Sequence, residues 1–202
     1  MVHNSDPLVL ASASATRQRL LRAAGIPFDA LPARVDEEAI RAALAADGAG
    51  PRDTADALAE IKARRIGERY PDRLVLGCDQ VLDHRGQSFG KPGSRVEAAA
   101  QLRALRNDRH SLLSAAVLYQ DGRPVWRHVG VARLTMRNFS DTYLDAYLAR
   151  NWKRLQDTVG GYKLEEEGVR LFARIEGDHF TVQGLPLVEL VSYLTLRGYL
   201  PG

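Results

Sequence analysis

The segment LVLGCDQVLD, residues 74–83, limits most tightly how this chain can fold. Four of its first five residues are apolar, which is typical of a strand buried inside a sheet. Asp79 and Gln80 follow at once, and the chain then turns apolar again. We therefore expect a central strand over residues 73–79 that ends in a carboxylate. Ligands bind at such strand ends in open α/β sheets.

Strand and helix signals alternate before this segment. Small residues and Gly25 bound the first helix, and a proline and glycines break the second helical region. From the N-terminus, the pattern predicts a strand at 7–12, a helix at 14–25, an extended piece at 26–33, and helical residues over 36–70 with a break at 47–51.

The second half of the chain mixes a hairpin with further helices. Asp121 and Gly122 lie between two extended runs, 111–120 and 123–137, which is a hairpin signal. Ser94 and Glu97 form a capping box at the start of a helix. We expect helices at 94–107, 140–150 and 186–198, and a strand, a Gly-Asp turn and a further strand within 168–182. Together these elements predict an α/β fold with a mixed sheet flanked by helices.

Length and composition exclude several classes of protein. The 202 residues fit one domain, with room for two lobes around a cleft. A net charge of +3 is too small to indicate nucleic acid or a membrane surface as a partner. Cys78 is the one cysteine, so neither an intrachain disulfide nor a zinc cluster can form. With no signal peptide pattern and no long apolar run, we expect a cytoplasmic protein.

The turn ASASATR, residues 11–17, has the features of a phosphate cradle. Small residues between a strand and a helix leave backbone N–H groups free, and the helix dipole favours an anion there. Ser14 and Thr16 add hydroxyls, and Arg17 adds a cation. Alternatively, Ser14 only caps the helix and Arg17 lies on its solvated face.

Three charged residues elsewhere are candidates for the same site. Asp79 can hold a divalent cation or activate water, or it can simply cap a turn. Lys91 lies in the rigid sequence GKP, which suits a polyphosphate, although a solvated lysine is the alternative. Lys62 either lines a pocket or decorates a helix. Cys78, on the opposite side of the strand from Asp79, is expected in the core.

The segment GGYKLEEEG, residues 160–168, combines an aromatic ring with carboxylates. Tyr162 could stack on a base, and one glutamate could accept two hydrogen bonds from a guanine-type edge. The alternative is a solvated acidic loop, in which Glu165, Glu166 and Glu167 are equivalent. The five histidines show no metal-ligand spacing.

The order of these motifs along the chain is more specific than any one of them. The blocks LVLASASATRQRLL, DE at 36–37, IKA, GCDQV, GKP, RH at 109–110, VGGYKLEEEG and IEGDHFTVQGLPL resemble the Maf-like family of nucleoside triphosphate pyrophosphatases over roughly residues 7–196. The resemblance implies one domain, 1–202, with an elongated mixed sheet and two lobes around a deep cleft, like the inosine triphosphate pyrophosphatases. It also implies a homodimer and a requirement for Mg²⁺ or Mn²⁺.

The resemblance assigns roles to individual residues. Members of the family cleave a nucleoside triphosphate to the monophosphate and pyrophosphate. By position in the family motifs, the triphosphate would be bound by Ser14, Arg17, Lys62 and Lys91. Glu37 and Asp79 would hold the metal, with Asp79 also acting as general base.

Three departures from the common motifs indicate a substrate. Members that act on pyrimidine nucleotides have arginine, threonine and glutamine where this chain has Thr16, Gln80 and Glu165, and all three changes resemble the 7-methyl-GTP subfamily. N7-methylation makes the base cationic, and a carboxylate attracts it more strongly than an amide does. Ala15 and Glu166 also depart from the usual proline and glycine. The alternatives are the same reaction on dTTP, UTP or CTP, and a non-catalytic regulator of cell division.

Overall fold

The computed structural model describes residues 6–201. The first five residues of the N-terminal stretch considered for a signal peptide lie outside this range. No helix within 6–201 is long and apolar enough to cross a membrane. The elements follow in the order β1 Leu8–Leu10, α1 Ala15–Ala23, β2 Phe28–Ala30, α2 Glu37–Ala46, α3 Pro51–Gly67, β3 Val75–His84, β4 Gln87–Phe89, α4 Arg95–Leu105, β5 Arg109–Gln120, β6 Arg123–Met136, α5 Asp141–Leu155, η1 Val159–Gly161, η2 Glu167–Leu171, β7 Phe172–Glu176, α6 His179–Val182 and α7 Leu187–Leu196.

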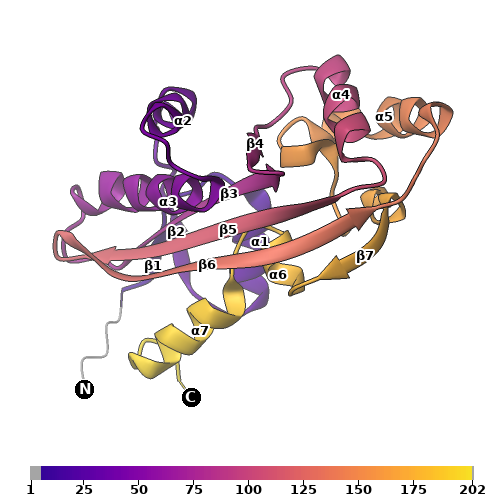
Figure 1. Cartoon of the computed structure of the whole chain (residues 1–202). Helices are drawn as coiled ribbons and strands as arrows, with labels where there is room; N and C mark the ends of the chain where they lie inside the picture. Colours follow the sequence, from indigo (N-terminus) through magenta and orange to yellow (C-terminus); the bar gives the residue numbers. More distant parts are fainter. Residues whose placement is uncertain (1–5, 202) are drawn as a thin grey trace.

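The sheet is mixed, as the sequence predicts. Its strand order is β2-β1-β3-β5-β6-β7, and the short strand β4 pairs with β3. β1 runs parallel to both β2 and β3, whereas the remaining pairs are antiparallel. The long β5–β6 hairpin turns at Asp121 and Gly122, which both have positive φ. Figure 1 shows this hairpin spanning the length of the molecule.

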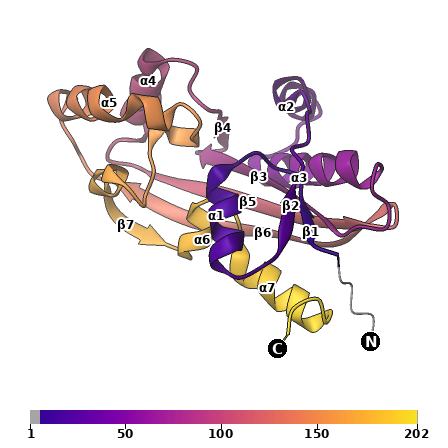
Figure 2. The same cartoon turned by 180° about the vertical axis from the view of Figure 1, so that it is seen from behind.

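Helices cover both faces of the sheet (Figures 1 and 2). Val75 and Val81 of β3 pack with the alanines of α3 on one face. Leu76 and Cys78 alternate with them and pack with α1 and α7 on the other. At the far end of the hairpin, Leu82 belongs to a third apolar cluster, built mainly from α4 and α5. The expected α/β architecture with flanking helices is therefore confirmed.

Gly77 sets the distance between α3 and β3. A Cβ atom at this residue would lie 2.0 Å from the Ala59 carbonyl oxygen and 2.6 Å from the Ala63 amide nitrogen. Only a residue without a side chain allows the helix this close to the strand. This close packing brings the α3 residue Lys62 against the strand residue Asp79.

Two sequence-based expectations are wrong. β3 does not end at Asp79 but continues to His84, because β5 pairs with it along this whole stretch and β4 joins from Leu82. The second strand expected within 168–182 is the helix α6. Asp178 caps this helix, since its carboxylate accepts hydrogen bonds from the Phe180 and Thr181 amides.

Candidate active site

A cavity of about 1140 Å³ opens at the free edge of β3. β1 pairs with β3 only as far as Leu76, and β4 pairs from Leu82 onward. Between these points, β3 has no strand of the described chain on that side. The cavity is lined by all nine residues that the sequence motifs select: Ser14, Thr16, Arg17, Glu37, Lys62, Asp79, Gln80, Lys91 and Glu165.

Arg17 fills the free edge of the strand. Its Nη1 donates to the Cys78 carbonyl oxygen at 3.1 Å, and its Nε donates to the Gly184 carbonyl oxygen at 2.8 Å. Arg17 therefore does not lie on a solvated helix face, and that interpretation is wrong. Ser14 does cap α1, because its Oγ accepts a hydrogen bond from the Arg17 amide at 3.3 Å. The turn thus fixes a cation at the cavity wall.

Lys62 and Asp79 form a buried ion pair. Lys62 Nζ lies 2.8 Å from Asp79 Oδ1 and 2.8 Å from Glu37 Oε1. The two paired side chains are only 8% and 5% exposed, for Lys62 and Asp79 respectively. A charge at this depth needs a partner, so Lys62 does not decorate a solvated helix face. The lysine instead holds two carboxylates toward one point.

Arg41, which belongs to none of the sequence motifs, completes the charge cluster. Its Nη2 lies 2.8 Å from Asp79 Oδ2 and 4.0 Å from Glu37 Oε2. Both Asp79 oxygens therefore contact a cation. The available signal was the i,i+4 spacing of Glu37 and Arg41 on one helix, which places both side chains on the same face.

Nearby cations keep Glu37 ionised. Burial by itself raises the pKa of Glu37, but Lys62, Lys91 and Arg41 outweigh it, so the pKa lies below its ordinary value. Lys91 is exposed on the loop before α4 and influences Glu37 across the cavity. Glu37 is therefore negative at neutral pH and lies among several positive side chains.

The carboxylates fit a metal only in part. No group of three or more histidine, cysteine, aspartate or glutamate side chains within residues 6–201 could hold an ion. Glu37 and Asp79 nevertheless converge, since both contact the same lysine nitrogen. Mg²⁺ commonly takes one or two protein carboxylates and completes its shell with substrate phosphates and water. This donor set suits a divalent cation that arrives with a polyphosphate.

Gln80 lies on the opposite face of β3 from Asp79. Its amide nitrogen donates to Ser114 Oγ at 3.0 Å and to the carbonyl oxygens of Val182 and Thr181 at 3.0 and 3.3 Å. These acceptors hold the amide group in place, so the oxygen is the atom that remains for a ligand. Thr16 borders the same cavity from the first turn of α1.

The three glutamates of the loop 160–168 are not equivalent. Glu166 pairs with Arg154 at 3.1 Å, and Glu167 pairs with Arg150. Glu165 lines the cavity with a 24% exposed side chain, and the nearest cation in the described chain is Arg19 at 3.5 Å. Of the three, Glu165 is the residue whose carboxylate a ligand can reach.

Tyr162 borders the cavity, but its side chain is largely buried in the apolar cluster next to the loop. Its hydroxyl lies 2.7 Å from His110 Nε2, and its ring packs edge-on against Phe172 at 4.8 Å. Burial lowers the pKa of His110 to about 4, so the imidazole is neutral at pH 7. Cys78 is a core residue as expected, and burial raises the pKa of its thiol to about 11.

Fold and site together define an α/β protein with a cavity at the edge of its sheet. Cationic side chains line this cavity, and the carboxylates of Glu37 and Asp79 stand among them. The chain belongs to the Maf family: the family model described as Maf-like protein matches residues 7–196.

Relatives match the chain along almost its whole length. A nucleoside triphosphate pyrophosphatase of Roseobacter denitrificans is 61% identical over 97% of this chain and 98% of its own. Proteins of the same name from Ruegeria pomeroyi and Caulobacter vibrioides are 58% and 50% identical, over 95% and 96% of this chain and 96% and 97% of their own. A solved nucleoside-triphosphatase, a dITP/XTP pyrophosphatase from Mycobacterium abscessus, aligns over 97% of this chain and 98% of that chain at 15% identity, with a TM-score of 0.44.

Proposed function

We propose that this protein is a nucleoside triphosphate pyrophosphatase that acts on 7-methyl-GTP, releasing 7-methyl-GMP and pyrophosphate. The coarser activity is the one for which its relatives are named. The observation that carries the proposal is the convergence of Arg17, Lys62 and Lys91 on one cavity that also contains Asp79. Cations from three distant segments match a triphosphate, and the acid lies among them.

The triphosphate would bind along this row of cations. Arg17 and the first turn of α1 would hold one end, with Ser14 contributing its hydroxyl, and Lys62 and Lys91 the other. Water would then attack the α-phosphorus, the bond to the bridging oxygen would break, and pyrophosphate would leave. Asp79 would orient this water and accept its proton.

A divalent cation fits beside Asp79. Glu37 and Asp79 would hold Mg²⁺ or Mn²⁺ together with phosphate oxygens, and the ion would neutralise charge on the triphosphate. Lys62 stays between the two carboxylates and keeps them convergent, since its amine contacts both at 2.8 Å.

Base selection would fall to Glu165, with Thr16 and Gln80. A methylated guanine is cationic and presents N–H donors on one edge, and a carboxylate matches both properties. Arg19 already lies 3.5 Å from Glu165, but its side chain is 56% exposed. Such an exposed pair is worth little, about 0–1 kcal/mol, so a cationic base can replace the arginine.

A panel of triphosphates tests the proposal. Pyrophosphate release in the presence of Mg²⁺ is measured for 7-methyl-GTP, GTP, dTTP, UTP and CTP. We expect kcat/KM for 7-methyl-GTP to exceed that for UTP by at least 10-fold, or about 1.4 kcal/mol. Faster release from dTTP, UTP or CTP would support the pyrimidine alternative. No release from any of them would support the non-catalytic one.

A further inference from the structure

Arg41 blocks the group on which the proposed reaction depends. Its Nη2 contacts Asp79 Oδ2 at 2.8 Å, while Lys62 contacts Oδ1 at the same distance. The Asp79 side chain is 5% exposed, although it borders the cavity. Both of its oxygens are already paired with cations, so a metal ion can replace a partner at Asp79 only where one of the two cations leaves.

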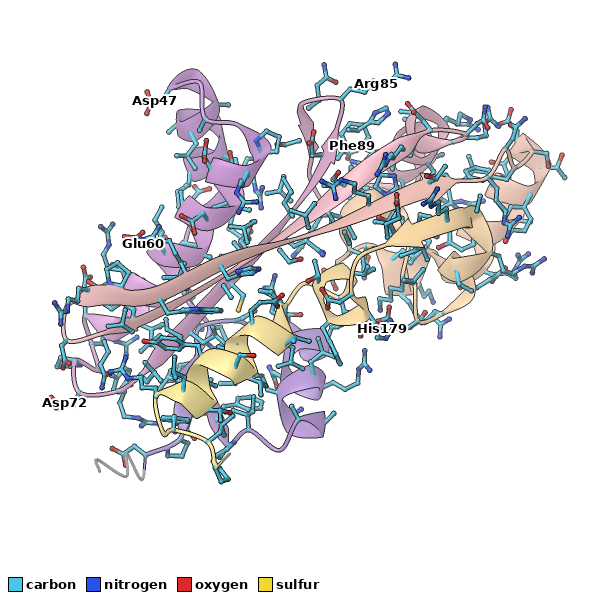
Figure 3. The ribbon with its side chains drawn as sticks, turned by 60° about the horizontal axis from the view of Figure 1, so that its bottom comes forward. Asp47, Glu60, Asp72, Arg85, Phe89 and His179 are labelled. Carbon is cyan, nitrogen blue, oxygen red and sulfur yellow. The ribbon has the colours of Figure 1, made fainter. Side chains whose placement is uncertain are left out.

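The two cations differ in how firmly the fold holds them. Lys62 is buried and contacts two carboxylates. It lies on α3, which packs closely on β3 at Gly77. Arg41 is 26% exposed on α2, a helix that buries none of its residues. Figure 3 shows the end of α2, marked by Asp47, standing away from the sheet, whereas Glu60 on α3 lies beside it. Arg41 is therefore the cation that can leave.

The contact that Arg41 makes is also of the exchangeable kind. One nitrogen, Nη2, contacts both Asp79 and Glu37, so the guanidinium does not form the paired, parallel bonds of a bidentate arginine–carboxylate contact. Its remaining donors have no acceptor within the described part of the chain. A guanidinium with free donors at the wall of a cavity suits phosphate oxygens.

We propose that Arg41 is a further polyphosphate-binding residue, which caps Asp79 in the free protein and transfers to the substrate phosphates when a metal-bound nucleotide enters. The proposal rests on the function proposed above. Moving Arg41 uncovers Oδ2 for the metal, and the charge that the arginine loses at Asp79 is replaced by the negative charge of the phosphates. Arg41 thus opposes binding of the metal alone but favours binding of the nucleotide.

The test compares the effect of Arg41 on binding of the metal alone with its effect on binding of the nucleotide. Binding of Mn²⁺ without nucleotide is measured by electron paramagnetic resonance, and KM is measured for the best substrate of the triphosphate panel. The variants are Arg41→Met and Arg41→Lys. Arg52→Met is the matched control, since Arg52 is exposed at the start of α3 and does not line the cavity. Asp79→Asn reports on the metal site itself.

We expect Arg41→Met to tighten Mn²⁺ binding at least threefold and to raise KM at least fivefold, with a smaller change in kcat. Arg41→Lys should recover part of the loss in KM, and Arg52→Met should change neither quantity. A merely structural role would weaken both affinities together. Unchanged or weaker Mn²⁺ binding in Arg41→Met overturns the proposal, and so does an unchanged KM.

The Asp79→Asn variant distinguishes the proposed role of Arg41 from the proposed metal site on which it depends. Loss of Mn²⁺ binding in Asp79→Asn, with no effect of Arg41→Met, removes the role of Arg41 and leaves the metal site in place. Equal Mn²⁺ binding in Arg41→Met and in the double variant Arg41→Met/Asp79→Asn overturns the metal site, and the inference about Arg41 falls with it.

Discussion

The two ends of the cavity are built differently. At the proposed triphosphate end, Lys62 and Asp79 are almost fully buried, and backbone carbonyls of β3 and residue 184 hold Arg17. At the proposed base end, Glu165 and its neighbour Arg19 are 24% and 56% exposed. The first region belongs to the core packing of α3 on β3, whereas the second is a loop with surface ion pairs.

Under the proposed function, this difference would separate the residues that carry out the reaction from those that select the substrate. Changing one member of a buried ion pair lowers stability as well as affecting the chemistry, because the remaining partner loses a counter-charge. Changing an exposed carboxylate costs little stability. A fold of this kind can keep one reaction and alter the base it accepts. The following predictions test that separation, beginning with the largest effect.

Asp79→Asn should lower kcat at least 1,000-fold, equivalent to about 4 kcal/mol of transition-state stabilisation. The amide cannot accept the proton of the attacking water, and it binds a divalent cation poorly. The protein should remain folded by circular dichroism, because Lys62 keeps Glu37 as a partner. More than a tenth of the original kcat would rule out the role of Asp79.

Gly77→Ala should destabilise the protein by about 3 kcal/mol, since the added methyl group overlaps the α3 backbone. The measurement is urea unfolding followed by circular dichroism. Gly90→Ala is the control, because nothing lies within 4 Å of its Cβ position and its φ is not positive. Equal stability of the two variants would mean that α3 is not packed on β3 as closely as described.

Acidification should lower the stability of the folded protein through His110, the residue that contacts Tyr162. The pKa of this buried imidazole is about 4 in the folded protein, below its ordinary value of 6.5, because burial disfavours the charged form and the His84 charge adds to this, while Asp108 opposes it. The unfolded chain therefore binds a proton first, and stability falls as the pH falls from 6.5 toward 4. We expect this residue alone to account for about 2 kcal/mol of the loss between pH 7 and pH 4.5.

The comparison for this prediction is His110→Gln against His128→Gln. His110→Gln should show a smaller loss of stability between pH 7 and pH 4.5 than the unmodified protein. The His128→Gln variant is the control, because His128 is partly exposed on β6. The same pH dependence in all three proteins would contradict a neutral, buried His110.

Glu165→Gln should have the smallest effect and the most selective one. We expect kcat/KM for 7-methyl-GTP to fall about fivefold, or about 1 kcal/mol, because the charged acceptor becomes neutral. The value for UTP should change less than twofold. Glu166→Gln is the matched control, since that carboxylate pairs with Arg154. Equal losses on both substrates would remove Glu165 from base selection.

Motif order predicted which residues border the cavity, whereas local pattern missed several details of the structure around it. The nine selected residues come from segments far apart in the sequence, yet all border one cavity. The mixed sheet, the hairpin at Asp121 and the cap at Ser94 also followed from local chemistry. These features depend on short-range rules that a sequence displays directly.

The details that were missed depend on long-range packing. The extension of β3 beyond Asp79 comes from pairing with β5, which no local pattern near residue 79 indicates. Tyr162 was predicted as a residue that could stack on a base, and no local pattern indicated that its hydroxyl contacts His110, fifty-two residues away, in the core. The spacing of Arg41 from Glu37 was visible in the sequence, but its contact with Asp79, thirty-eight residues away, depends on the tertiary fold.

The most direct test of the account is a competition between two substrates in one vessel. The protein is mixed with Mg²⁺ and equal concentrations of 7-methyl-GTP and UTP, and the two monophosphates are separated and counted at early times. Their ratio gives the ratio of kcat/KM without any difference in enzyme preparation. The account predicts at least ten molecules of 7-methyl-GMP for each UMP, whereas a ratio of one or less would contradict it.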